Sequence, residues 1–350
     1  MRQFTIRVPA SSANIGPGFD VLGIALSLYL TIEVTIDHKN ANNVPLNCEV
    51  TNSGLGAEQL PTAADANLIT RTALYILRCH GMRTFPVGTK VHINNDIPLG
   101  RGLGSSGAAV IAGVMLGNAV GQLDLSKERL MDFALMIERH PDNISAAMFG
   151  GFVGSFLREL SGTELERVEI PVAEVLPEPS GGVDTGLTPP EPPVGISRQM
   201  SYDLAPELKA IAVIPAFEVS TAKSRDVLPT AYTRQDAIFN LQRLSVLIPA
   251  LGRSPVDAEL VHLAMQDRLH QKYRRILVPG LATILTFMTP RTHKGFVGVC
   301  LSGAGPTVLA LATENFDAIA EEIVSAFNAE GVECTWKLLD CCDGATVEEK

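Results

Sequence analysis

Residues 97–108 form a glycine- and serine-rich segment that restricts the local fold more than any other part of the chain. The segment reads Ile-Pro-Leu-Gly-Arg-Gly-Leu-Gly-Ser-Ser-Gly-Ala and joins a strand-like run at 89–93 to a small-residue helical run at 108–121. Backbone without side chains that leads into a helix offers amide groups and the positive end of the helix dipole to an anion. The serine hydroxyls add donors for phosphate oxygens and ligands for a hard cation. The segment therefore predicts a strand–loop–helix unit that binds nucleotide phosphates.

The residues alone leave two other interpretations of this loop open, although a Walker loop is excluded because the chain has no Gly-Lys-Ser/Thr. Gly102-x-Gly104-x-x-Gly107 matches the dinucleotide fingerprint, with Asp124 downstream. However, a proline-containing loop separates these glycines from the strand, whereas the dinucleotide turn follows its strand at once. Close helix packing through alanine and glycine explains 108–117 but not the loop before it.

A proline- and glycine-rich stretch divides the chain. Residues 177–193 contain six prolines and three glycines, which exclude a helix or a central strand. We expect an N-terminal domain over 1–170, a linker over 171–206 and a C-terminal domain over 207–345. The patterns predict strands at 3–8, 24–36, 89–94, 152–157, 209–214, 296–301, 307–312 and 333–338. They predict helices at 65–80 (with Asp65 as N-cap), 105–120, 126–139, 142–149, 235–250, 256–267 and 315–329. The second half resembles a ferredoxin-like βαββαβ arrangement with an extra helix.

Composition narrows the class of partner. A net charge of −10 disfavours nucleic acid and anionic membranes, and no apolar run reaches the length of a membrane span. Strand-like alternation begins directly after Met1, so we expect no signal peptide and a cytoplasmic protein. The six cysteines lack metal-ligand spacing, which favours reduced thiols.

Three motifs in a fixed order resemble the kinases that act on galactose, homoserine, mevalonate and phosphomevalonate, known as the GHMP family. They are PASSANIGPGFD at 9–20, PLGRGLGSSGA at 98–108 and LSGAGPT at 301–307. The first motif and the His-Pro-Asp-Asn run at 140–143 resemble the members that phosphorylate homoserine. The resemblance implies an α+β, two-domain GHMP kinase fold. Its N-terminal ATP-binding domain is similar to domain 2 of ribosomal protein S5, and its C-terminal domain is ferredoxin-like.

The same resemblance implies ATP and Mg²⁺ as cofactors. The residues that it assigns to ATP are Pro98, Gly100, Arg101, Gly102, Leu103, Gly104, Ser105, Ser106 and Gly107, with Asn67 near the adenine. Ser106 and Glu138 would hold Mg²⁺, and they join His140 as the expected catalytic residues. Serines also cap helices routinely, which is the simpler interpretation of Ser105 and Ser106. A carboxylate such as Glu138 near a helix C-terminus opposes the helix dipole, so its position suggests a function.

The resemblance also implies an acceptor pocket for an amino acid. Such a substrate needs carboxylates for its ammonium group and arginine for its carboxylate. The residues that match the acceptor-binding positions are Asn14, Asp20, His140, Asp142, Thr221, Arg225, Arg274 and Gly303. Arg275 adjoins Arg274, and the sequence leaves the choice between them open.

The implied reaction is phosphorylation of the L-homoserine hydroxyl by Mg-ATP, which gives O-phospho-L-homoserine for threonine synthesis. Mevalonate-type relatives place a lysine beside the first motif, but this chain has no lysine before Lys39. We therefore expect orientation and the phosphate itself to activate the hydroxyl, with His140 positioning it. The resemblance implies a homodimer and no nucleic-acid or membrane partner. The alternatives are another GHMP small-molecule kinase with a mevalonate-type acceptor, and a non-catalytic ATP-binding sensor on the same fold.

Overall fold

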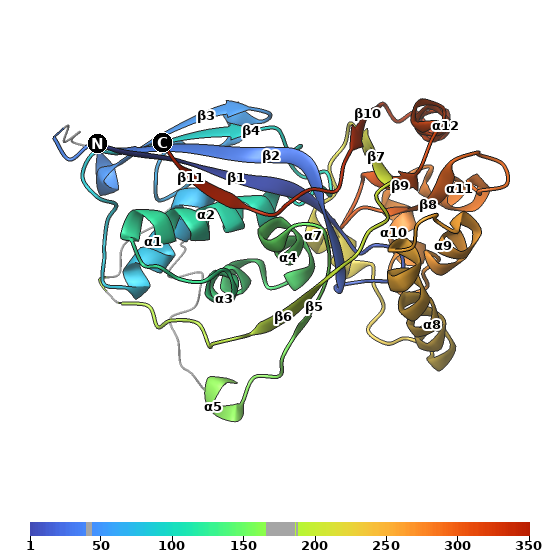
Figure 1. The fold of residues 1–350 in the computed structure, drawn as a ribbon, viewed down its shortest axis with the longest axis horizontal. Helices are drawn as coiled ribbons and strands as arrows, with labels where there is room; N and C mark the ends of the chain where they lie inside the picture. The colour runs from blue at the N-terminus through green and yellow to red at the C-terminus, as the bar shows by residue number, and fades with distance from the viewer. Residues whose placement is uncertain (40–43, 166–185, 187) are drawn as a thin grey trace.

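The computed structural model describes residues 1–39, 44–165, 186 and 188–350, and it contains two β-sheets that pack against helices (Figure 1). The first sheet has the order β11-β1-β2-β4-β3, and β5 and β6 extend it from β2. Its strands are β1 (Arg2–Ala13), β2 (Leu22–Ile36), β3 (Cys48–Gly54), β4 (Thr89–Asn95), β5 (Phe152–Leu157), β6 (Ser197–Tyr202) and β11 (Thr346–Glu349). β3 and β4 are parallel, and the other pairs are antiparallel.

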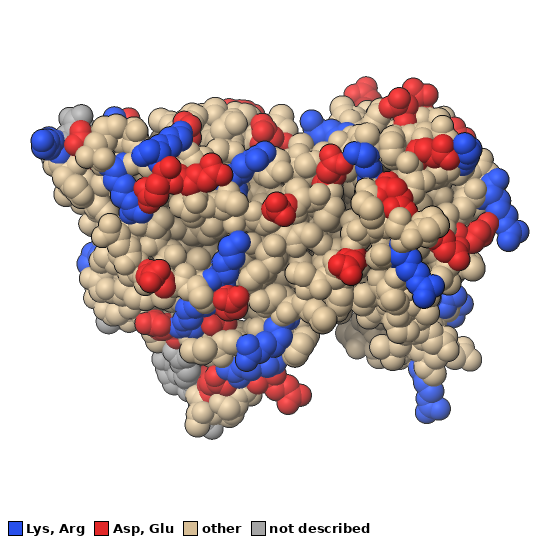
Figure 2. Space-filling model, in the orientation of Figure 1, with Lys and Arg blue, Asp and Glu red and all other residues tan. Residues whose placement is uncertain are grey.

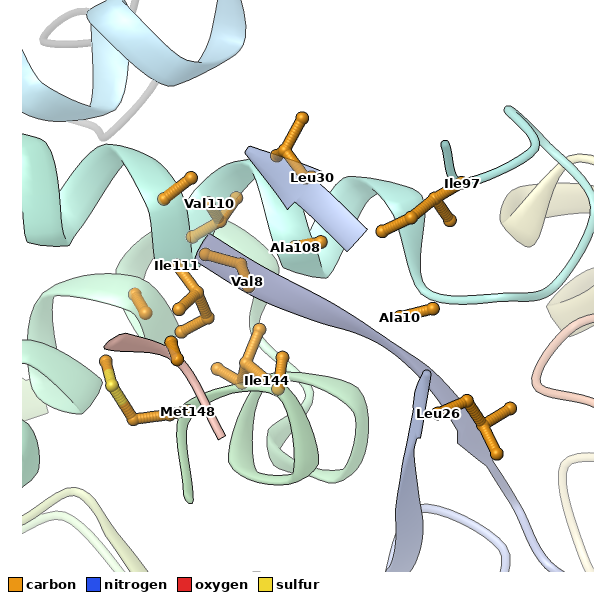
Figure 3. Close-up of a cluster of buried hydrophobic side chains, with 14 of the residues drawn as sticks. Val8, Ala10, Leu26, Leu30, Ile97, Ala108, Val110, Ile111, Ile144 and Met148 are labelled. Carbon is orange, nitrogen blue, oxygen red and sulfur yellow. The ribbon is translucent and has the colours of Figure 1, made fainter. Parts of the chain in front are cut away.

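Four helices cover one face of this sheet: α1 (Leu68–Cys79), α2 (Ser105–Gly121), α3 (Lys127–Glu138) and α4 (Pro141–Phe149). Val8 of β1 points toward Ile111 of α2 and Ile144 of α4 in the core between the layers (Figure 3), and all three side chains are fully buried. α2 is rich in small residues because α1 lies close to it. A Cβ at Gly113 would lie 2.5 Å from Cβ of Thr72. Close packing therefore explains the body of α2, and the loop before it needs its own explanation.

The C-terminal domain has a four-stranded antiparallel sheet in the order β10-β7-β9-β8. Its strands are β7 (Lys209–Pro215), β8 (Phe296–Leu301), β9 (Val308–Ala312) and β10 (Cys334–Leu339). Its helices are α7 (Thr221–Asp226), α8 (Arg234–Leu251), α9 (Ala258–Ala264), α10 (Gln271–Arg274), α11 (Leu281–Phe287) and α12 (Phe316–Ala329). This strand order is the ferredoxin-like order, as the pattern of the second half predicts.

The end of the chain returns to the N-terminal sheet. β11 pairs with β1, and Arg2 donates to the carboxylate of Glu349. The expected linker at 171–206 contains β6, which pairs with β5 in the first sheet. Residues 166–185 and 187, which include most of the proline-rich stretch at 177–193, lie outside the described residues. The sheet of the first domain thus includes two strands from beyond residue 170.

Element boundaries differ from the predictions in a few places. α1 begins at Leu68 rather than near Asp65, because the Asn67 side chain caps it by accepting a hydrogen bond from the amide of Ile69 at 3.0 Å. The helix expected at 256–267 covers only Ala258–Ala264. Strands β3, β6 and β11 and the short helices α5 (Gly162–Leu165), α7, α10 and α11 were not predicted.

The described surface mixes charges of both signs. On the face shown in Figure 2, lysines and arginines are interspersed with aspartates and glutamates over both domains. Across the described ranges, no helix has the length and apolar character needed to cross a bilayer.

Candidate functional site

Segments from both domains meet in one cavity of about 130 Å³ where α2, α4 and α7 approach each other (Figure 1). The cavity is lined by most of the residues that the motifs single out. They are Asn14, Asp20, Gly100, Arg101, Gly102, Gly104, Ser105, Ser106, Gly107, Glu138, His140, Asp142, Thr221, Arg225, Arg274 and Gly303. Residues from six separate parts of the sequence are thus gathered into one site. A larger hollow of about 660 Å³ beside β1, β2 and the C-terminal segment contains none of them.

The glycine loop lies tightly between β1 and the C-terminal domain, and this explains two of its glycines. Gly102 and Gly104 have φ of +79° and +70°. A Cβ at Gly102 would lie 2.4 Å from the carbonyl oxygen of Ser302, and one at Gly104 would lie 2.1 Å from Oγ of Ser11. Both positions therefore require glycine for conformation and for space. The loop ends where α2 begins, so backbone amides at the start of a 17-residue helix border the cavity.

Ser106 and Glu138 form a hydroxyl–carboxylate pair at the cavity wall. The Ser106 hydroxyl donates a hydrogen bond to Glu138 at 2.9 Å. Glu138 is the last residue of α3, and Arg139 ends that helix in the left-handed region before α4 begins. Burial raises the pKa of Glu138, and the Ser106 hydrogen bond lowers it in part.

Asp142 and His140 lie at the N-terminus of α4. His140 is the N-cap residue, Pro141 occupies the first turn, and Asp142 is 2% exposed. Burial, together with the charge of Asp20, raises the pKa of Asp142 to about 7. Burial and the nearby Arg225 lower the pKa of His140, which favours a neutral imidazole.

Asp20 and Arg225 form a two-pronged ion pair at the cavity. The guanidinium of Arg225 donates to the two carboxylate oxygens of Asp20 at 2.6 and 3.2 Å. Asn14 and Asp20 both have left-handed backbone, with φ of +60° and +57°. The Asn14 side chain holds this turn, because its Oδ1 accepts from the amide of Asp20 and its Nδ2 donates to the carbonyl of Gly303. Strained backbone of this kind often marks functional sites.

Arg274 rather than Arg275 faces the cavity, which resolves the choice that the sequence left open. Arg274 is 1% exposed and donates to the carbonyls of Ser224 and Gly303, at 3.1 Å in each case. Burial, together with the like charge of Arg225, lowers the pKa of Arg274 to about 10. Arg275 is exposed and lines a different cavity.

His270 contacts Arg274 and helps to hold it in place, a role that was not predicted from the sequence. Its Nε2 lies 2.9 Å from the carbonyl oxygen of Gly16, and its Nδ1 lies 3.4 Å from Nη1 of Arg274. Burial is the main cause that lowers the pKa of His270. A neutral ring that donates from Nε2 leaves the Nδ1 lone pair for Arg274. The i, i+4 spacing of His270 and Arg274 could have suggested this contact.

Three predicted site residues lie beside the cavity rather than in it. Leu103 is fully buried in the core, and Pro98 lines a separate groove next to β10. Asn67 lines an apolar pocket of about 240 Å³ that continues from the cavity along Gly100, Ser105 and Ser106. Its side chain caps α1 and donates to the carbonyl of Pro61. The polar atoms of Asn67 therefore have structural partners.

Arg101 borders the cavity, but its guanidinium is bound to the C-terminal domain. Nη1 of Arg101 donates to the carbonyls of Pro215 and Phe217, the second at 2.9 Å. Glu218 lies 3.8 Å from its Nη2. The Arg101 side chain thus links the glycine loop to the segment that leads into α7.

The cavity has further lining residues that were not among the predicted site residues. They are Asn143, Ala304 and Gly305, and Val219 joins them from outside any motif. Oδ1 of Asn143 accepts from the Ser11 hydroxyl at 3.0 Å, which leaves the Asn143 amide group as a donor at the cavity wall. Asn143 directly follows Asp142 in the first turn of α4, and that position was the signal that could have identified it.

The donor set at Ser106 and Glu138 fits Mg²⁺. This ion binds oxygen ligands, and proteins usually supply one or two of them while substrate phosphates and water supply the rest. A hydroxyl and a carboxylate 2.9 Å apart beside a phosphate-binding loop match that pattern. Within the described ranges, no group of three or more histidine, cysteine, aspartate or glutamate side chains forms a candidate metal site.

Known proteins resemble this chain over its full length. The GHMP kinases N terminal domain matches residues 67–151, and the GHMP kinases C terminal domain matches residues 248–331. Homoserine kinase of Saccharomyces cerevisiae is 61% identical over 100% of both chains, and that of Schizosaccharomyces pombe is 50% identical over 99% of both. The crystal structure of homoserine kinase from Cytophaga hutchinsonii has the same fold, with a TM-score of 0.74, 22% identity and coverage of 99% of this chain and 97% of that one.

Proposed function

The chain belongs to the homoserine kinases of the GHMP kinase family, and from this premise we propose that it transfers the γ-phosphoryl group of ATP to the side-chain hydroxyl of L-homoserine. The products are ADP and O-phospho-L-homoserine. The observation that carries the proposal is one cavity that joins a glycine-rich anion-binding loop to two carboxylates and two arginines. A mevalonate-type acceptor has no ammonium group that Asp20 and Asp142 could bind.

The nucleotide would lie along the glycine loop. The amides at the start of α2 face its phosphates, and the apolar pocket beside Ser105 and Ser106 suits the adenine ring. Leucines and Ile69 form the walls of that pocket. Because the Asn67 side chain has structural partners, we propose that it shapes the adenine pocket by holding the start of α1.

Ser106 and Glu138 would hold Mg²⁺ against the phosphates. The ion, when bound, neutralises charge on the β- and γ-phosphates. Glu138 must then lose any proton that its raised pKa retains, and the cation favours that loss.

The acceptor would bind as a zwitterion. Asp20 and Arg225 are bonded to each other, and an amino acid offers each of them a partner of opposite charge. Arg274 and Asp142 lie in the same cavity and extend the carboxylate and ammonium sites respectively. Paired arginines suit a carboxylate because the guanidinium fork donates two parallel hydrogen bonds.

Phosphoryl transfer makes a bond from the homoserine oxygen to phosphorus and breaks the bond from phosphorus to the β-phosphate oxygen. The hydroxyl proton leaves to a phosphate oxygen or to water. The loose transition state needs positioning and charge neutralisation more than a strong base. A neutral His140 and the Asn143 amide, both at the N-terminus of α4, are placed to orient the hydroxyl.

ADP release by the purified protein with Mg-ATP tests this function. L-Homoserine, D-homoserine, L-serine, L-threonine and mevalonate are offered separately, and the product mass is measured. We expect turnover with L-homoserine and a product heavier by one phosphoryl group. Turnover with mevalonate alone would overturn the acceptor assignment, and ATP binding without turnover on any acceptor would favour the sensor alternative.

A further inference from the structure

The short turn that carries Arg274 has a second face with a cavity of its own. Residues 267–275 separate the acceptor cavity from a hollow of about 440 Å³ among α8, α9, α10 and α11. His270 and Arg274 contact the acceptor side. Arg268, Lys272 and Arg275, which repeat at i, i+4 and i+7, all line the other hollow.

This second hollow has an excess of positive charge. Its only lining carboxylate among the described residues is Asp267, whose two oxygens already accept hydrogen bonds from Asn240 and from three backbone amides. Arg268 and Lys272 share a single carboxylate, Asp236, at 3.7 and 3.1 Å. Within the described part of the chain, no carboxylate lies at ion-pair distance from Arg275.

Two arginines that contact the same aromatic ring add to this excess of positive charge at the edge of the hollow. The guanidinium carbons of Arg243 and Arg268 lie 3.2 and 3.9 Å from the centroid of the Phe239 ring. Nε of Arg243 is buried and has no hydrogen-bond partner among the described residues. Such a concentration of like charges is unfavourable unless an anion accompanies it. It stands out in a chain whose net charge is −10.

The remaining walls are apolar or neutral. Leu285 and Ala282 of α11 and Val299 of β8 form one side, and Gln266 and Thr286 add uncharged hydrogen-bonding groups. Concave sites with an apolar wall and a few convergent polar groups are typical of small-molecule pockets, and the volume is within their usual range.

We propose that this hollow, the α10 anion site, binds a small polyanion that carries phosphate or carboxylate groups. Arg268, Lys272 and Arg275 bind its charged groups, and the α11 wall contacts its carbon skeleton. Guanidinium groups donate in pairs to either kind of oxyanion, so both phosphate and carboxylate ligands meet the same chemistry. The site is separate from the acceptor cavity, and no residue lines both.

Calorimetric titration tests the proposal independently of turnover. The protein is saturated with Mg²⁺ and a non-hydrolysable ATP analogue, so that the glycine loop is filled, and then titrated with inorganic phosphate or with tricarballylate. We expect binding of at least one probe with a Kd of about 1 mM or below. The variant Arg275→Glu should weaken the binding of the probe at least tenfold, because it replaces a positive charge of the hollow with a negative one. Arg275 is exposed, so its replacement should leave the fold intact.

The matched control is Arg253→Glu, which changes the net charge equally at an exposed position outside the hollow. It should leave the affinity within twofold of the parent. Phosphate binding alone would assign the site to phosphate esters, and tricarballylate binding alone would assign it to polycarboxylates. The proposal fails if neither probe binds up to about 10 mM, if Arg275→Glu binds as the parent does, or if both variants lose affinity equally.

Discussion

Burial sets the charge of individual groups in the acceptor cavity. Asp142 at the start of α4 has a pKa raised to about 7, and Arg274 beside it has one lowered to about 10. Both shifts disfavour the charged form of the side chain. Near pH 7, Asp142 therefore has less negative charge than an exposed aspartate has. A substrate ammonium group would reverse the shift of Asp142 by supplying the missing counter-charge.

This predicts a pH-dependent affinity for the acceptor. Below about pH 7 Asp142 holds a proton that must leave before it can accept the ammonium group, so KM for L-homoserine should rise as pH falls from 8 to 6. KM for ATP should stay level over this range. Steady-state kinetics at half-unit steps of pH measure both, and a KM for L-homoserine that does not change with pH would contradict the prediction. Asp142→Asn should abolish the slope and give a higher KM at pH 8.

The same group predicts a change in stability. Because the folded-state pKa of Asp142 lies above the ordinary aspartate value of about 3.8, the native state binds an extra proton between about pH 4 and pH 7. The stability that the proton confers is therefore complete at low pH and decreases as pH rises toward 7. Asp142→Asn removes the cost of the buried charge. In the absence of ligands, the free energy of unfolding of the variant minus that of the parent should therefore be larger at pH 8 than at pH 5. Urea unfolding at the two pH values measures the difference, for which about 3 kcal/mol is the upper limit, because about two pH units separate pH 5 from the folded-state pKa.

Arg225 should contribute to acceptor binding and not to nucleotide binding. Arg225→Ala removes the partner of Asp20 and one of the two proposed carboxylate ligands. We expect KM for L-homoserine to rise roughly tenfold to a hundredfold and KM for ATP to change little, because a charged hydrogen bond at a half-exposed site contributes about 1.5–3 kcal/mol. Arg253→Ala is the control for lost charge. Equal increases in both KM values would contradict the assignment.

The motifs identified residues that the fold brings together, because most of them line one cavity. They could not predict which of Arg274 and Arg275 turns inward, since the difference depends on how residues 267–275 pack. The i, i+4 spacing is compatible with the contact between His270 and Arg274, but the motifs could not predict that the carbonyl of Gly16 from the other domain binds the His270 ring. Asn67 shows the opposite limit, since a residue that matches a binding motif can owe its place to a helix cap.

At the scale of elements, the long helices and most strands agree with prediction, whereas β3, β6, β11 and the short helices α5, α7, α10 and α11 were not predicted. α2 and α12 were predicted because they have many residues with helical character, and β1 because of its alternation. β6 and β11 have mostly exposed side chains and are held by pairing with strands far away in the sequence. Local pattern contains no information about such pairing.

A comparison of alanine substitutions at Gly104 and Gly81 tests how strictly the loop requires glycine. Gly104→Ala meets both a left-handed φ and a contact of 2.1 Å with Ser11, whereas Gly81→Ala meets a φ of +79° with nothing within 4 Å. We expect Gly81→Ala to lower the free energy of unfolding by about 1 kcal/mol, and Gly104→Ala to lower it by about 2 kcal/mol or more. Gly104→Ala should also raise KM for ATP. Chemical denaturation and kinetics measure the two effects, and equal losses for both variants would show that the contact with Ser11 does not matter.

At the scale of the whole molecule, the active site depends on how the two domains are joined. Arg101 bridges them by donating from the glycine loop to the carbonyls of Pro215 and Phe217. The turn at 302–305 completes the junction, because Ser302 donates to the carbonyl of Gly102 at 2.6 Å. The glycine loop and the arginines of the cavity are therefore held in place relative to each other by contacts that neither domain provides alone.

Arg101→Lys should lower kcat/KM for both substrates together. A lysine ammonium keeps the charge, but its nitrogen lies one bond closer to the backbone than Nη1, the atom that donates to both carbonyls. We expect kcat/KM to fall about tenfold for ATP and for L-homoserine, which corresponds to about 1.4 kcal/mol of lost transition-state stabilisation. Glu218→Gln, which alters only the longer contact of 3.8 Å, should have little effect. A change confined to ATP would mean that Arg101 binds nucleotide and does not join the domains.

The pairing of β11 with β1 has a consequence for how the chain matures on the ribosome. Arg2 is synthesised long before Glu349, yet its strand gains its outer neighbour only when Glu349 has emerged. Until then the amides and carbonyls of β1 on that side have no strand partner, and such an open edge invites pairing with other chains. The outer edge of β1 thus stays open while the second domain is translated.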